Sequence, residues 1–154
     1  MAKAWHWIIK DDKTKILDMV EYFENELVDA RREVKQSGVI ETLAQQLPAY
    51  HELRFSQLQQ VETVLEILEI ELKQLESEKF KHLLEHYKRA LSSSDCKKYV
   101  DGDPDVVATN QMIADVAYIR NQLLGVVKSL EMKAFQLNNI VRLRTAGIED
   151  SRID

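Results

Sequence analysis

The 154-residue sequence is poor in the residues that interrupt helices. It contains four Gly and two Pro, so the backbone has few positions at which a turn is favoured. Long helices with few breaks are therefore expected. A chain of this length is also long enough to bury a sizeable core. We predict a single all-helical domain spanning residues 1–154.

The sequence also lacks the features of an exported or membrane protein. It has one cysteine, Cys96, so an internal disulfide is excluded. The N-terminal segment MAKAWHWIIKDD has neither the long apolar core nor the small-residue cleavage site of a secretory signal. Charged residues interrupt each hydrophobic run before it reaches the roughly 20 residues that a membrane span needs. We therefore expect a cytoplasmic protein that does not associate with membranes.

An overall excess of positive charge is missing as well, since the formal net charge is −5. Contact with a polyanion would therefore depend on a local basic patch. The charges are segregated along the chain. Residues 62–78 hold six Glu and one Lys, whereas residues 79–98 hold six Lys or Arg and two acids. The second segment is the candidate patch.

The spacing of apolar residues predicts four helices. Asp12 is a suitable N-cap for the first, and Gly38 ends it. Pro48 is expected to separate the second helix from the third, because the first turn of a helix does not use that N–H group. Asp103 and Pro104 resemble the cap and first residue of the last helix, with a loop before them. The predicted helices span about 12–37, 39–47, 48–91 and 104–146.

The third predicted helix carries an apolar seam with heptad spacing. The seam consists of Leu58, Val61, Leu65, Leu68, Leu72 and Leu75. Such a helix needs an equally long partner to bury its seam, and the last predicted helix is the obvious candidate. The predicted fold class is all-α, a long antiparallel helical hairpin that is coiled-coil-like, with an additional N-terminal helix.

Beyond Leu75 the heptad positions become basic. They are occupied by Lys79, His82, His86 and Arg89, and apolar residues reappear one position later, beginning at Phe80. The helix face must therefore rotate relative to its partner near residues 76–80. A kink, an unwound turn or a change of partner would each produce this rotation.

The motif HLLEH at residues 82–86 places two histidines on one helical face, in the inverted pattern of zinc peptidases. A peptidase also needs a third metal ligand and a substrate cleft, and Glu85 has basic partners at helical spacing in Lys81 and Arg89. Glycine-rich phosphate loops and nucleophile elbows are missing too. We therefore expect no enzyme, no metal and no cofactor.

Two interpretations of the basic segment remain open. One is a helix end that merely faces water, since charged runs are usually solvated surfaces. The other is a surface that contacts the phosphates of nucleic acid. The candidate nucleic-acid-binding residues are Lys79, Lys81, His82, Lys88, Arg89, Lys97 and Lys98.

The N-terminal segment KAWHWIIK combines aromatic and cationic residues, which can stack on unpaired bases. However, Trp7, Ile8 and Ile9 form a run too apolar to be left in water. We favour packing of this segment against the helical bundle or a neighbouring subunit over contact with DNA.

Residues 97–147 resemble the UvsY-type recombination mediator proteins of large tailed phages, and the resemblance extends more loosely over residues 79–87. One signature is the basic segment and short loop that lead into the last helix, with Asp101, Asp103, Asp105 and Val106. The other signature is the C-terminal pattern formed by Lys133, Phe135, Leu137, Ile140 and Arg144.

The resemblance implies a non-enzymatic homo-oligomer that binds single-stranded DNA in phage recombination and repair. It would help a RecA-like recombinase displace the single-strand-binding protein, in the host cytoplasm if it is phage-encoded. Lys81 matches a basic position of the family's DNA-contacting helix, whereas Leu83 stands where a second basic residue is expected.

The resemblance also implies that residues 130–147 drive subunit assembly. This segment is too rich in apolar residues for a single seam, and a second apolar face is what an oligomer interface needs. The candidate interface residues are Leu130, Phe135, Leu137, Ile140, Val141 and Leu143. The alternative function is that of a purely structural coiled-coil protein, such as a phage assembly chaperone or scaffold.

Overall fold

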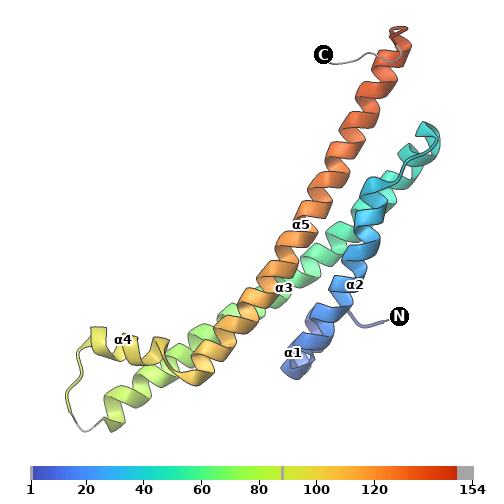
Figure 1. The fold of residues 1–154 in the computed structure, drawn as a ribbon. Helices are drawn as coiled ribbons and strands as arrows, with labels where there is room; N and C mark the ends of the chain where they lie inside the picture. Colours follow the sequence, from blue (N-terminus) through green and yellow to red (C-terminus); the bar gives the residue numbers. More distant parts are fainter. Residues whose placement is uncertain (1, 88, 149–154) are drawn as a thin grey trace. The chain divides into compact units, whose positions relative to one another are not determined.

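The computed structural model describes residues 2–87 and 89–148, which form an all-α fold (Figure 1). The two longest helices, α3 and α5, pack antiparallel, as the heptad seam predicted. The all-helical hairpin is thus confirmed, whereas assembly into a homo-oligomer stays a prediction. The helices are α1 (Trp5–Asp11), α2 (Ile16–Lys35), α3 (Ile40–His86), α4 (Ser93–Asp101) and α5 (Pro104–Thr145), and a 3₁₀ turn (Lys13–Lys15) precedes α2.

The chain divides into two compact units. The first unit comprises residues 2–21 and 60–120, and the second comprises residues 22–59 and 121–148. Three helices, α2, α3 and α5, continue from one unit into the other. The number of independently folding domains stays a prediction.

The first unit packs α1 and α4 onto the antiparallel segments of α3 and α5. The backbone N–H of Trp5 donates to the Oε1 of Gln60 at 3.0 Å, and Ile9 is fully buried. Trp7 remains 51% exposed, with the Lys10 ammonium 5.5 Å from its ring centroid. The apolar N-terminal segment is therefore partly buried within the unit. The unit's other buried apolar residues are Ile16, Met19, Val61, Val64, Leu65, Leu68, Cys96, Val100, Val106, Val116 and Ile119.

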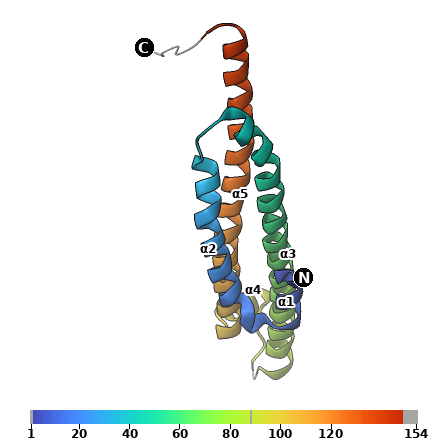
Figure 2. The ribbon, with the colours of Figure 1, turned by 90° about the vertical axis from the view of Figure 1, so that its right-hand side faces the viewer.

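The second unit is a three-helix arrangement of α2, the start of α3 and the end of α5. Its core follows the predicted periodicity and includes two polar residues, Arg54 and Gln57. The last turns of α5 extend beyond the connection between α2 and α3 (Figure 2). The buried apolar residues of this unit are Phe23, Leu27, Ala30, Leu43, Leu47, Leu58, Leu123, Val126, Val127 and Leu130.

The predicted helix boundary at Pro48 is wrong, because α3 begins at Ile40 and runs through Pro48 without a break. A proline inside a helix removes one backbone hydrogen bond and crowds the carbonyl four residues earlier. Leu43 and Leu47 are both buried just before it, and this burial of apolar surface offsets the cost of the proline.

We expect Pro48→Ala to raise the free energy of unfolding, because alanine restores the missing hydrogen bond to the Ala44 carbonyl. The gain should be as much as about 3 kcal/mol, the usual penalty of proline in a helix interior. Urea denaturation followed by circular dichroism measures it. Unchanged or lower stability would mean that the backbone and packing of α3 at this position already accommodate the proline ring.

The segment after α3 also differs from the prediction. The third helix was expected to reach residue 91 and to be followed by a loop, but α3 ends at His86 and α4 forms at Ser93–Asp101. Ser92 is the N-cap of α4, since its Oγ accepts from the N–H of Asp95 at 3.2 Å. The serines that interrupt the apolar pattern in the sequence therefore begin a new helix. In this helix, Cys96 and Val100 are buried and lie one turn apart.

The rotation expected near residues 76–80 does not interrupt α3, which is continuous there. Instead α4 becomes a neighbour of α3. Phe80 of α3 is half-buried and lines a cavity together with Val100 of α4. A change of packing partner therefore accompanies the shift of the apolar positions.

Candidate nucleic-acid interface

The predicted basic residues lie at the end of α3, in the following connection and on α4, all within the first unit (Figure 1). Lys81, Arg89, Lys97 and Lys98 are exposed. Lys88 lies outside the described residues. The two segments of the basic stretch, on α3 and on α4, therefore lie in the same unit, and their contact with DNA stays a prediction.

Lys79 is engaged in a specific ion-pair cluster. Its Nζ lies 3.2 Å from Oδ2 of Asp103 and 2.8 Å from Oδ2 of Asp105. The hydrogen bonds to Asp105 and Asp103 raise the pKa of Lys79. Two carboxylates therefore offset its charge, so Lys79 ties α3 to the start of α5 and is a poor phosphate ligand.

The start of α5 is formed as predicted. The Asp103 Oδ1 accepts a hydrogen bond from the N–H of Asp105 at 2.9 Å, and Pro104 is the first residue of the helix. Burial acts to raise the pKa of the Asp103 carboxyl, but the N–H of Asp105 and the Lys79 ammonium outweigh burial and lower it. Asp103 thus stays ionised both as a helix cap and as an ion-pair partner.

His82 and His86 stack on one another, with ring centroids 4.6 Å apart. The Nδ1 of His86 lies 3.2 Å from the backbone carbonyl of His82, and Glu85 pairs with Lys81 at 3.8 Å. Within residues 2–87 and 89–148, no three His, Cys, Asp or Glu side chains gather where they would hold a metal ion. The HLLEH motif forms a stacked pair of rings on an exposed helical face.

Three cations of this region have no ion-pair partner among the described residues, namely Arg89, Lys97 and Lys98. Lys97 faces a cavity of about 510 Å³ between α3 and α4, which Lys73 also lines. Sequence reasoning missed Lys73 because it lies in the glutamate-rich segment. Lys73 lies seven residues before Phe80 and hence on the same face of α3. This spacing could have indicated that the two residues line the same cavity.

Sequence reasoning also missed a pair of tyrosines beside the basic residues. Tyr87 and Tyr99 have ring centroids 5.8 Å apart, and a hydrogen bond to Tyr99 raises the pKa of Tyr87. Tyr99 is 53% exposed and lines a second cavity next to His82. An aromatic residue that directly follows two lysines on α4 was the signal for it.

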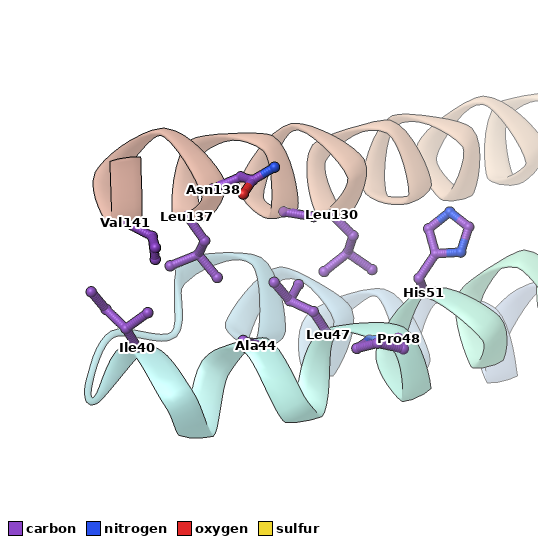
Figure 3. A pocket seen from close by; sticks show the side chains of 10 residues that line it. Ile40, Ala44, Leu47, Pro48, His51, Leu130, Leu137, Asn138 and Val141 are labelled. Atoms are coloured by element: carbon purple, nitrogen blue, oxygen red, sulfur yellow. The ribbon is translucent and has the colours of Figure 1, made fainter. Parts of the chain in front are cut away.

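The candidate oligomerisation residues lie in the second unit and fall into three groups. Leu130 is buried in the core of its own chain. Leu137 and Val141 face a cavity of about 440 Å³ lined on the other side by Ile40, Ala44 and Leu47 of α3 (Figure 3). Phe135, Ile140 and Leu143 are exposed, and so is Val141 despite lining the cavity. Met132, which sequence reasoning missed, is exposed too.

Comparisons with known proteins add no relationship to this picture: no protein-family model matches the chain, and no curated protein or solved structure matches it significantly. None of the helices in the described part of the chain is long and apolar enough to cross a membrane.

Proposed function

We propose that this protein is a non-enzymatic mediator of recombination that binds single-stranded DNA and assists the loading of a RecA-like recombinase in phage recombination and repair. The proposal rests on the sequence resemblance and on one structural observation. Arg89, Lys97 and Lys98 are exposed at one end of α3 and α4, without ion-pair partners among residues 2–87 and 89–148. Such cations are available for phosphates.

Lys81 is a further candidate at the end of α3, although no contact among the described residues joins it to the lysines of α4. Its side chain is 75% exposed, and its pair with Glu85 is long, at 3.8 Å. Exposed ion pairs of this kind contribute little, so a phosphate can displace the glutamate. We name Lys81, Arg89, Lys97 and Lys98 the basic end, and propose that it follows the strand's backbone.

A single basic end offers few phosphate contacts, so repetition of the site in an oligomer would strengthen binding through effective concentration. The exposed apolar residues of α5 supply a surface for such assembly. Met132, Phe135 and Leu143 share one helical face, roughly opposite the face that carries Leu137 and Val141. We propose that this second face joins subunits of a homo-oligomer.

The DNA-binding proposal is tested by the salt dependence of affinity for a labelled single-stranded oligonucleotide, measured by fluorescence anisotropy. Changing both Lys97 and Lys98 to Glu should weaken binding at least tenfold. It should also reduce the slope of log K against log[salt] by about 1.4, because each phosphate contact on a single strand contributes about 0.7.

The matched control changes Lys35 and Lys128, two exposed lysines of the second unit, to Glu. This double substitution gives the same change in net charge. Affinity and slope should stay close to those of the wild type. An equal loss in both double variants would show that total charge, rather than the basic end, governs binding.

The second candidate function is that of a coiled-coil assembly chaperone or scaffold. The exposed apolar stretch of α5 favours it, since Phe135 is 67% and Met132 is 65% exposed, and such surfaces mark sites of protein association. Light scattering alongside the DNA titration separates the two functions. A stable oligomer that binds no DNA at low salt would support the scaffold.

A further inference from the structure

The cavity beside Tyr99 is large enough to hold a small molecule. Its volume is about 590 Å³, within the range of roughly 300–1,000 Å³ typical of such sites. It lies in the first unit, between the end of α3, α4 and the turn that leads into α5. The lining residues include His82, Leu83, Tyr99, Val100 and Pro104 together with the polar Glu78, Lys79 and Asp103.

The charge of this cavity disfavours a phosphate group. Among residues 2–87 and 89–148, Lys79 is the one lysine that lines the cavity, and its ammonium is already paired with Asp103 and Asp105. Glu78 and Asp103 add two carboxylates to the lining. Carboxylates repel phosphate but accept hydrogen bonds from the amino groups of bases.

The flat side chains of the cavity are held in place by neighbours. The ring of Tyr99 lies beside that of Tyr87, with centroids 5.8 Å apart, and His82 stacks on His86. Rings that are already ordered lose little conformational freedom when a ligand stacks on them. Aromatic side chains are also the usual stacking partners of unpaired bases.

We propose that this cavity binds one unpaired nucleobase of a single strand whose phosphates contact the basic end. This inference rests on the proposed function and specifies what that site recognises. Lys97 and Lys98 directly precede Tyr99 on α4, so the same helix presents cations to the backbone and a ring to the base. A base must leave its stack and its pair to enter the cavity, so duplex DNA is disfavoured.

The carboxylates give the cavity a base preference. Adenine, cytosine and guanine carry an exocyclic amino group that can donate to Glu78 or Asp103, whereas thymine has only its ring N3–H to donate. Homopolymers of deoxycytidine should therefore bind more tightly than homopolymers of deoxythymidine of the same length. Both are compared at one salt concentration, where the phosphates contribute equally to the affinity of each strand.

The test compares a cytosine oligonucleotide with an abasic oligonucleotide of the same length and charge, by competition in the anisotropy assay. The wild type should prefer the cytosine strand about 5- to 150-fold, the range expected for loss of one stacked base. Tyr99→Ala and His82→Ala should each lose most of this preference while keeping the wild-type salt slope. Tyr118→Ala is the control, since Tyr118 is an exposed tyrosine of the same unit.

The possible results separate the two proposals. Equal binding of cytosine and abasic strands by the wild type, with a steep salt slope, would overturn the base site and leave the DNA-binding function standing. No binding of either strand would overturn both. Competition by free deoxycytidine at micromolar concentration would show a nucleoside site, and would overturn the assignment to a strand.

Discussion

Arg54→Met is expected to lower the free energy of unfolding by about 3–5 kcal/mol, because it leaves two carboxylates in a buried network without their cation. Arg54 is 2% exposed and binds both Glu26 and Glu33 of α2. Its Nε and Nη2 donate to the two carboxylate oxygens of Glu33 at 2.9 and 2.5 Å, and its Nη1 donates to Glu26 at 2.7 Å.

Gln57 completes this network. Its amide oxygen accepts from the Nη1 of Arg54 at 2.9 Å, and its amide nitrogen donates to Glu26 at 2.6 Å. Burial opposes the charge of Arg54, but its hydrogen bonds with Glu33 and Glu26 prevail and raise its pKa. Four of the five N–H groups of the guanidinium are thus bonded to groups of α2 and α3.

Urea denaturation followed by circular dichroism measures the effect of Arg54→Met. The informative control replaces Arg54, Glu26, Glu33 and Gln57 together by methionine, since an apolar substitute for a whole buried ion network is often as stable as the original. Recovery of most of the lost stability is expected. If Arg54→Met lowers the free energy of unfolding by less than about 1 kcal/mol, the Arg54 side chain is exposed to water and does not hold a buried ion network.

Lys133→Met is expected to lower the free energy of unfolding by about 1.5–3 kcal/mol, the usual worth of hydrogen bonds from a charged donor. The Lys133 ammonium donates to the backbone carbonyls of Glu33, Val34 and Gln36, at 3.0, 3.0 and 2.6 Å. These carbonyls lie at the C-terminus of α2, where a positive charge is favoured. Lys133 therefore caps α2 from α5.

Hydrogen exchange distinguishes this role from a general loss of packing. In Lys133→Met the last turn of α2 should exchange faster, whereas α4, in the other unit, should exchange as in the wild type. Lys128→Met serves as the control, because Lys128 is an exposed lysine of the same helix and should change neither stability nor exchange. Slow exchange at the end of α2 in Lys133→Met would contradict the capping role.

The sequence was sufficient to predict the long helices, because their apolar periodicity is strong. Phe23 and Leu27 of α2 and Leu65 and Leu68 of α3 are buried as expected. The polar core escaped the prediction, although a signal existed. Extending the seam upstream by four residues from Leu58 reaches Arg54, and a charged residue at a core heptad position marks a buried interaction.

The segments that escaped prediction are those whose structure depends on neighbours. Serines and an aspartate are compatible with a loop or with a helix start, and in α4 the burial of Cys96 and Val100 favours the helix. A proline usually ends a helix when no other part of the protein packs against it. At Pro48, the packing of Leu43 and Leu47 keeps α3 intact.

The candidate site was predictable only in part, for a similar reason. The local excess of Lys and Arg located the basic end, but its ion pairing depends on residues distant in the sequence. Asp103 and Asp105 follow Lys79 by more than twenty residues, so periodicity on one helix does not reveal that Lys79 is occupied. Tyr99 and His82 likewise share a cavity only because α4 packs beside α3.

Lysine footprinting tests the central claim most directly. Acetylation of the free and DNA-bound protein, followed by mass spectrometry, reports which ammonium groups a single strand covers. The account predicts that Lys97 and Lys98 become protected on addition of a single-stranded oligonucleotide, whereas Lys35 and Lys128 react as before and Lys79 changes little. Uniform protection of all lysines, or protection confined to the second unit, would contradict it.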